Sequence, residues 1–228
     1  MSRNVKDLHP FLQIKINELQ ELCNKKGLKI GIGECLRTVK EQDGLYALGR
    51  TKGGNIVTNA RGSSYSSMHQ WGIAFDFYRN DGKGAYNNTD KFFDRVGTIG
   101  QSIGLEWGGN WRSIKDNPHF QLPIYGSDSG IIKSIYANPI EFIKTWNYKP
   151  ATAITNKSKQ SDILWLQERL SLCLNKEMKL DTVFGNQVNN GILEYWKLLD
   201  WNISSTVVNG YYKAGDSTIE ALSKFRVT

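Results

Sequence analysis

The sequence predicts an α+β fold for residues 1–148, a linker over residues 149–160 and a small all-α domain over residues 161–228. Two kinds of hydrophobic spacing lead to this division. Large apolar residues alternate with small or polar ones over residues 71–76, which indicates a short strand with one apolar face. In the C-terminal part, apolar residues recur at helical spacing at Ile163, Leu166, Leu170 and Leu174.

The N-terminal elements follow from the same spacing. A helix is predicted over residues 10–25, because an apolar stripe follows Pro10 and proline suits the first turn of a helix. We expect His9, directly before that proline, to be solvated. Residues 28–32 alternate and predict the first strand. Residues 38–62 predict a short helix and then a glycine-containing loop over a cleft.

The later elements are bounded by turn and capping residues. Gly72 is expected to let the start of the strand at residues 71–76 curve. Thr89 and Asp90 predict the cap of a helix that ends near Ile103 and covers the sheet. Another helix is predicted around residues 139–143. After the polar linker, three helices are predicted, the first of them capped by Ser161 or Asp162.

A histidine and an aspartate lie seven positions apart around the central strand. His69 precedes this strand and Asp76 ends it, so a curved start can direct both side chains at one point. The chain has three histidines, and His9 lies in a plain helical context. We therefore expect His119 to supply the second imidazole. Three protein ligands with a fourth position left for water are typical of a catalytic zinc site.

A zinc site of this kind also needs a group that moves a proton. Asp116, three positions before His119 in a turn that contains proline, is the natural candidate. The alternative is a turn residue that only accepts hydrogen bonds from the local backbone.

The residues around these positions resemble a known family. Ser67-x-His69-x-x-Gly72-x-Ala74-x-Asp76, followed by Asp116-x-Pro118-His119-Phe120, resembles the zinc peptidases that include D-alanyl-D-alanine carboxypeptidases and L-alanyl-D-glutamate endopeptidases. The second group is the better match, since residues 34–38, 45–51 and 57–60 resemble its segments ahead of the first metal ligand.

The resemblance implies roles for individual residues. His69, Asp76 and His119 would bind Zn²⁺, Asp116 would act as general base and acid, and Arg37 would hold the substrate carbonyl or the oxyanion. Ser67 would place a hydroxyl near the metal. Trp107 and Trp111 are candidates for a wall of the substrate site, with packing in the core as the equal alternative.

Charge and composition limit the partners. The net charge is +7, of which +6 lies in residues 1–150, and this favours an anionic partner such as a cell wall or nucleic acid. No recognisable nucleic-acid-binding motif is present, and no apolar run is long enough for membrane insertion. The start lacks an apolar signal core, which predicts synthesis in the cytoplasm and action on the wall after release. Three cysteines without a paired motif are expected to be free thiols.

The C-terminal part has a resemblance of its own. Leu166-Gln167, Leu180-Asp181-x-x-Phe184-Gly185 and Val208-Asn209-Gly210 resemble the three-helix peptidoglycan-binding modules of wall hydrolases. Its exposed aromatic residues would stack on sugar rings, with candidates Tyr195, Trp201, Tyr211 and Tyr212. The alternative is an unrelated small helical domain.

Together these patterns predict a peptidoglycan hydrolase of the endolysin type. The expected reaction is cleavage of the L-alanyl-D-glutamate bond of the stem peptide by zinc-activated water. Three alternatives stay open at this point: a D-alanyl-D-alanine carboxypeptidase, a wall-binding protein without catalysis, and a basic nucleic-acid binder.

Overall fold

The chain divides into two compact units, Met1–Trp146 and Asn147–Thr228. The computed structural model describes residues 1–112, 115–201, 207–208 and 210–227. Within the described ranges, none of the helices has the length and apolar character that a bilayer crossing needs.

Unit 1 is built on a four-stranded sheet. Its strands are β1 (Ile30–Ile32), β2 (Ala74–Arg79), β3 (Glu106–Trp107) and β4 (His119–Gln121). They lie in the order β1-β2-β4-β3, and every neighbouring pair is antiparallel. The small antiparallel sheet of the predicted α+β fold is thus confirmed.

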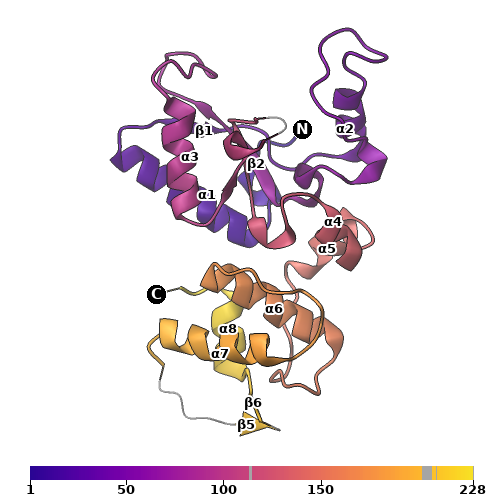
Figure 1. Cartoon of the computed structure of the whole chain (residues 1–228), viewed down its shortest axis with the longest axis vertical. Helices are drawn as coiled ribbons and strands as arrows, with labels where there is room; N and C mark the ends of the chain where they lie inside the picture. The colour runs from indigo at the N-terminus through magenta and orange to yellow at the C-terminus, as the bar shows by residue number, and fades with distance from the viewer. Residues whose placement is uncertain (113–114, 202–206, 209, 228) are drawn as a thin grey trace. The chain divides into compact units, whose positions relative to one another are not determined.

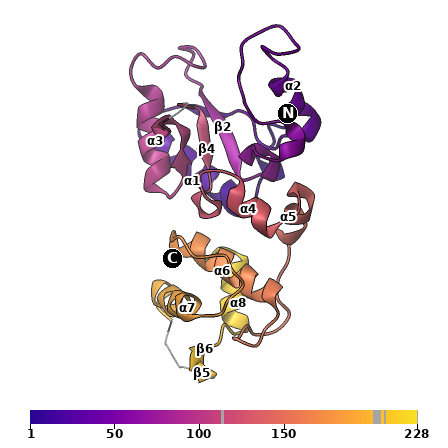
Figure 2. The ribbon, with the colours of Figure 1, turned by 45° about the vertical axis from the view of Figure 1, so that its right-hand side comes forward.

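Two helices cover one face of this sheet. α1 (Pro10–Lys25) and α3 (Phe92–Ser102) lie together on the same side of β2 and β4 (Figures 1 and 2). α3 packs very closely, because an added Cβ at Gly100 would lie 2.3 Å from the Phe120 ring. Alternate residues of a strand face opposite sides, so Phe75, Phe77 and Phe120 form the core under the helices. Asp76, His119 and Gln121 therefore face the other side.

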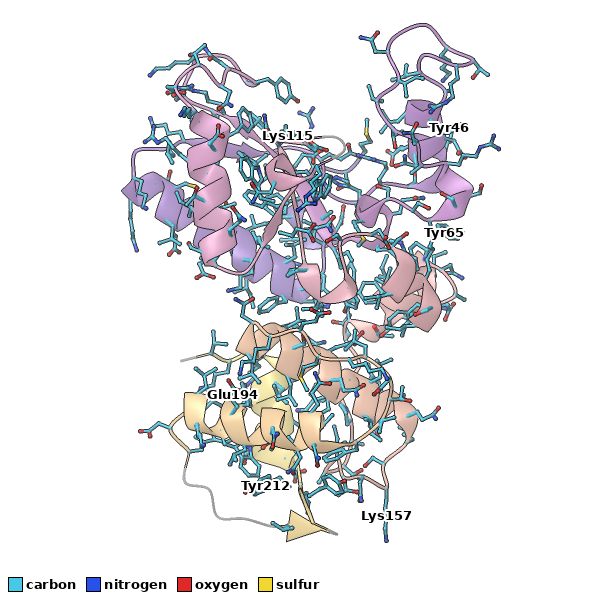
Figure 3. The ribbon with its side chains drawn as sticks, viewed as in Figure 1. Tyr46, Tyr65, Lys115, Lys157, Glu194 and Tyr212 are labelled. Atoms are coloured by element: carbon cyan, nitrogen blue, oxygen red, sulfur yellow. The ribbon has the colours of Figure 1, made fainter. Side chains whose placement is uncertain are left out.

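The remaining elements of unit 1 are short helices and single 3-10 turns. α2 (Val39–Tyr46) begins at a capping box between Thr38 and Glu41 and leads into a long loop. In Figure 3, Tyr46 lies on α2 at the end of the unit that carries this loop. α4 (Gly130–Ile135) and α5 (Pro139–Thr145) follow β4. Single 3-10 turns complete the unit: η1 (Val5–Asp7), η2 (Gly62–Ser64), η3 (Met68–Trp71), η4 (Gly108–Asn110) and η5 (Pro123–Tyr125).

The central strand begins later than the alternation predicts. Trp71 ends the 3-10 turn η3, and Gly72 has a φ of +66°, in the left-handed region that favours glycine. The curve predicted at Gly72 is therefore a full change of direction, and β2 begins only at Ala74. Asp76 lies within β2 and not at its end. The predicted and observed starts of the strand differ because Trp71 is buried as part of a turn.

Two other local predictions for unit 1 were wrong. His9 is 4% exposed, because its ring packs against Phe142 and its Nδ1 accepts the Phe11 N–H at the start of α1. The residue before α3 is Lys91, and Asn88 Oδ1 accepts the Phe93 N–H, so neither Thr89 nor Asp90 caps that helix.

Unit 2 contains the helices α6 (Gln160–Leu174), α7 (Asn186–Leu198) and α8 (Asp216–Ser223). Lys159 and not Ser161 or Asp162 precedes α6. The described residues also form a two-stranded sheet, β5 (Val207–Val208) with β6 (Tyr211–Tyr212), which the hydrophobic spacing did not predict.

Three further observations bear on the predictions for unit 2. Ile154, in the segment expected to be a linker, is fully buried and pairs with Ala214. Asn209, part of the C-terminal motif, lies outside the described residues. Of the four aromatic candidates for sugar stacking, Tyr195 is fully buried and its hydroxyl donates to the Arg226 carbonyl, so it cannot stack on a ligand.

Candidate metal centre

Three side chains that are distant in the sequence meet on the second face of the sheet. His69 Nε2 lies 3.2 Å from His119 Nδ1. Asp76 Oδ1 lies 3.3 Å from that His69 nitrogen and 3.4 Å from that His119 nitrogen. In the described part of the chain, this is the one group of three or more His, Cys, Asp or Glu residues arranged to hold a metal ion.

The sheet itself brings two of these residues together. Asp76 and His119 are direct partners in the antiparallel pairing of β2 with β4. Opposite residues of an antiparallel pair point to the same face, so their side chains lie next to each other. His69 reaches the same point from η3, because the left-handed Gly72 turns the chain between the two elements. Its backbone carbonyl also accepts the Arg37 N–H at 3.1 Å.

Hydrogen bonds at the far edges of the imidazoles fix both rings. His69 Nδ1 lies 2.9 Å from the Cys35 carbonyl oxygen, an acceptor, so this nitrogen carries the proton. His119 Nε2 lies 3.0 Å from Gln121 Oε1, again an acceptor. The nitrogens left as lone pairs are therefore His69 Nε2 and His119 Nδ1, which face each other and Asp76.

This donor set fits a zinc ion. Three lone-pair atoms at 3.2–3.4 Å repel one another unless a cation or proton lies between them. Asp76 Oδ1 is buried and has no hydrogen-bond donor. Bonds of 2.0–2.1 Å to a tetrahedral ion place its ligand atoms about 3.3–3.4 Å apart, which matches the observed separations.

The electrostatics of the three residues agree with a bound cation. Burial raises the pKa of Asp76, but the two neighbouring imidazoles outweigh this and hold its pKa well below the usual range. Burial would lower the pKa of His119, but the Asp76 carboxylate raises it above the usual range. The centre thus favours an ionised carboxylate and positive charge between the rings.

The three residues line a pocket of about 580 Å³. Two sides of it differ in character. The metal side comprises the three converging residues and Asp116, and the loop side comprises Leu45, Leu48 and residues 57–60. Of the predicted site residues, the pocket also includes Arg37, Ser67 and Trp111.

Arg37 lies on the pocket wall with its guanidinium held in place. Its Nε and Nη2 donate to the two carboxylate oxygens of Glu34, the latter at 2.7 Å. Its Nη1 donates to Gln42 Oε1 at 2.7 Å and to Ser67 Oγ at 3.4 Å. The Arg37 side chain is 10% exposed, so Arg37 and Glu34 form a largely buried ion pair on the pocket wall.

Asp116 lies beside the metal cluster in the pocket lining. Its backbone N–H donates to the Gly108 carbonyl, and its carbonyl accepts the His119 N–H, so a short turn fixes it relative to the ligand. A Cβ at Gly108 would lie 2.6 Å from the Asp116 carbonyl oxygen, which explains why this position suits glycine. Burial raises the pKa of Asp116 above its usual range.

The two tryptophans have different places. Trp107 is 7% exposed, does not belong to the pocket lining, and donates its Nε1–H to the Asn117 carbonyl. An added Cβ at Gly97 would lie 2.3 Å from its ring, so Trp107 packs under α3. This placement favours the packing alternative for Trp107. Trp111 lines the pocket, and its ring centre lies 4.9 Å from that of His119.

Sequence reasoning missed two glutamines at this site. Gln121 accepts a hydrogen bond from His119. The sequence could have indicated this contact, because residues two positions apart on a strand point to the same face of the sheet. Gln42 is fully buried and joins Arg37 to the loop side through Ala60 and Thr58. No local pattern in the sequence indicates that second role.

Comparison with known proteins gives the same picture of this unit. A family model described as D-alanyl-D-alanine carboxypeptidase matches residues 61–122. The chain is 40% identical over 126 residues to the peptidoglycan L-alanyl-D-glutamate endopeptidase CwlK of Bacillus subtilis (strain 168), a match that covers 51% of this chain and 74% of CwlK.

Two further relatives are more distant. The L-alanyl-D-glutamate peptidase of Listeria phage A118 is 30% identical over 134 residues, covering 55% of this chain and 42% of the phage protein. The crystal structure of the Serratia marcescens L-Ala D-Glu endopeptidase ChiX aligns with a TM-score of 0.40 and 22% identity, over 53% of this chain and 84% of ChiX. At that score the alignment adds nothing to the assignment.

The motif, the site and the relatives define a class of metallopeptidases. The chain belongs to the zinc peptidase family that includes D-alanyl-D-alanine carboxypeptidases and L-alanyl-D-glutamate endopeptidases.

Proposed function

We propose that this protein is a peptidoglycan hydrolase that cleaves the L-alanyl-D-glutamate bond of the stem peptide, with Zn²⁺ held by His69, Asp76 and His119. The observation that carries the proposal is the convergence of these residues beside Asp116, in a chain 40% identical to CwlK. The phage relative supports an endolysin type of activity.

The proposed chemistry uses the metal and one carboxylate. A zinc ion supplies a water with a pKa near 7 and polarises the scissile carbonyl. Asp116 accepts the proton of the attacking water and delivers it to the leaving amine. A carboxylate whose pKa is raised by burial is a stronger proton acceptor than an exposed one, which suits this role.

Arg37 and Ser67 act on the substrate carbonyl in this proposal. Arg37 is aimed from the pocket wall and held by Glu34 and Gln42, so it can donate to developing negative charge without first being ordered. Ser67 contacts Arg37 and presents its hydroxyl from the turn before His69. Trp111 contributes an apolar surface next to His119.

The pocket favours an endopeptidase over a carboxypeptidase. A carboxypeptidase must bind the terminal carboxylate of its substrate, which calls for a free cationic side chain. Among the described residues that line the pocket, Arg37 is the one Lys or Arg, and this proposal assigns its guanidinium to the scissile carbonyl, which leaves no second cation there for a terminal carboxylate. The pocket lining also contains Asp128, whose charge opposes a carboxylate.

Product analysis tests this proposal. Zinc-loaded protein is incubated with a defined muropeptide, and the fragments are identified by mass spectrometry. We expect a new amino terminus at D-glutamate and no release of terminal D-alanine. Release of D-alanine with an intact L-alanyl-D-glutamate bond would show the carboxypeptidase instead. Cleavage by a folded His69→Ala protein at the wild-type rate would exclude the metal mechanism.

For unit 2 we propose binding to the cell wall, which would hold unit 1 near its substrate. The support is the resemblance of its helix and turn motifs to wall-binding modules and a pocket lined by Lys149, Ala151, Asp216 and neighbouring residues. Cosedimentation of full-length Asp116→Asn protein with purified peptidoglycan measures this binding without digestion.

Filling the pocket by Ala151→Trp should weaken this sedimentation. Glu194→Ala on α7, outside the pocket lining, should not (Figure 3). Equal sedimentation of all three proteins would place wall binding outside this pocket.

A further inference from the structure

The metal ligand His119 is connected to a second layer of polar side chains. Its Nε2–H donates to Gln121 Oε1 at 3.0 Å. Both residues belong to β4 and lie two positions apart, so they share one face of the strand. Gln121 is 1% exposed, and a buried amide with its hydrogen bonds satisfied has little freedom to rotate.

The orientation of the Gln121 amide follows from its other neighbours. Its Nε2 donates to Glu106 Oε2 at 3.1 Å and lies 3.4 Å and 3.3 Å from the carbonyl oxygens of Gly126 and Ser127. Rotating the amide by 180° would place its oxygen against three acceptors. The same rotation would turn an N–H of the amide toward the imidazole N–H. The amide oxygen must therefore face His119.

The chain of hydrogen bonds continues to the pocket wall. Glu106 Oε1 accepts the Trp111 Nε1–H at 2.8 Å. The Trp111 ring packs against the His119 ring, with 4.9 Å between the ring centres. Two contacts thus position the His119 ring. The Gln121 amide oxygen accepts its Nε2–H, and the Trp111 ring, held by Glu106, packs against it at a tilt.

We propose that Gln121 and Glu106 are positioning residues that fix the tautomer and ring angle of His119, so that its Nδ1 is presented to the metal. This inference rests on the proposed metal site. Position 121 requires an amide, because the group must accept from an imidazole on one side and donate to a carboxylate on the other. Neither a carboxylate nor an apolar side chain can do both.

The opposite explanation is that Gln121 only satisfies buried backbone groups. Gln167 in unit 2 is a matched control that tests this alternative. Gln167 is also 1% exposed, donates to the Asp181 carboxylate at 2.9 Å and to the Val183 carbonyl at 3.2 Å, and accepts the Thr182 N–H. Replacing Gln167 with leucine removes an equivalent set of hydrogen bonds that involves no metal ligand.

The test measures the zinc dissociation constant of the full-length protein by competition with a chromophoric chelator. The visible spectrum of the Co²⁺-substituted protein reports the coordination geometry. We expect Gln121→Leu to weaken zinc binding by about 10- to 100-fold and to shift the Co²⁺ bands. Gln167→Leu should keep the wild-type zinc affinity and spectrum.

A swap of the two polar groups makes the test independent of folding problems in the leucine variant. Gln121→Glu places two carboxylates together and should weaken zinc binding. Adding Glu106→Gln supplies an amide that can donate to the new carboxylate at position 121 and still accept from Trp111. It should recover part of the lost affinity, since the carbonyls of Gly126 and Ser127 still face that carboxylate. A double variant no tighter than Gln121→Glu alone would overturn the inference, as would a folded Gln121→Leu protein with unchanged affinity and spectrum.

These readouts separate this inference from the proposed function. If the wild-type protein binds zinc and shows this dependence on Gln121 but cuts another bond, the proposed substrate is wrong and the positioning role stands. If it cuts the L-alanyl-D-glutamate bond and its zinc affinity does not change when Gln121 is replaced, the positioning role is wrong.

Discussion

The metal side and the loop side of the pocket are built in different ways. The metal side consists of residues on paired strands and an adjoining turn, with His69 and His119 4% and 5% exposed. The loop side is irregular, and Val57 is 59% exposed. We infer that the chemistry depends on the first side, where a small displacement is costly, and that the fit to the substrate depends on the second.

Removing a ligand from the metal side should give the largest effect. Asp76→Ala deletes the one carboxylate of the cluster and should abolish stoichiometric zinc binding. Loss of several kcal/mol of transition-state stabilisation corresponds to a decrease in kcat/KM of roughly 10³-fold or more. Metal analysis and muropeptide hydrolysis measure the two effects. Asp94→Ala on α3 is the control, and Asp76→Ala protein with full zinc content would contradict the assignment.

Asp116→Asn should separate catalysis from metal binding on the same side. The amide cannot accept the proton of the attacking water, so kcat should fall by about 10²- to 10⁴-fold. Zinc content and KM should stay near the wild-type values. Asp116→Glu keeps a carboxylate and should retain more activity than the asparagine variant. If Asp116→Asn keeps a tenth or more of the wild-type kcat, another group carries the proton.

The sequence indicated the metal side far better than the loop side. The alternation in residues 71–76 and the single remaining histidine were enough to nominate Asp76 and His119, which the structure pairs across β2 and β4. Strand geometry explains why the two residues meet, because opposite positions of neighbouring strands place their side chains on the same face. The predicted start of β2 was wrong, because an apolar residue such as Trp71 gives the same sequence pattern whether it is buried in a turn or in a strand.

The supporting residues could not be nominated in the same way. Gln42 is one of several polar residues on a short helix, and its importance lies in contacts 16 and 18 positions away in the chain. The prediction that His9 is solvated failed for the same reason. Its ring partners, Phe142 on α5 and Trp146 directly after α5, are distant in the sequence. Polar residues with long-range partners carry no periodic signal, so only the folded structure reveals them.

Gln42→Leu should weaken the loop side and leave the metal side intact. It removes one acceptor of Arg37 and the side-chain donor to the Ala60 carbonyl, two part-buried hydrogen bonds that contribute about 1 kcal/mol each. We expect KM to rise by about tenfold, with cleavage of the loop by protease becoming faster. The zinc dissociation constant should stay within about twofold of wild type.

The control for this substitution is Gln167→Leu, which removes a buried glutamine from unit 2. It should change neither loop proteolysis nor the KM for a small soluble muropeptide, whose cleavage does not depend on wall binding by unit 2. A large loss of zinc affinity in the Gln42→Leu protein would show that the two sides are coupled and that the contrast between them is wrong.

Arg50→Ala should have the smallest effect, although Arg50 contacts the loop at several points. Its guanidinium lies 4.0 Å from the Tyr46 ring centre and donates to the carbonyls of Tyr46 and Thr58 and to Asn59 Oδ1. All of these bonds are exposed, so water replaces them when the side chain is removed, and such contacts contribute about 1 kcal/mol or less. We expect KM to rise less than about threefold, and Arg50→Lys to lie between the alanine variant and wild type. A rise in KM as large as that of Gln42→Leu would mean that exposed contacts hold the loop side in place. Burial of Gln42 would then not explain the shape of the pocket.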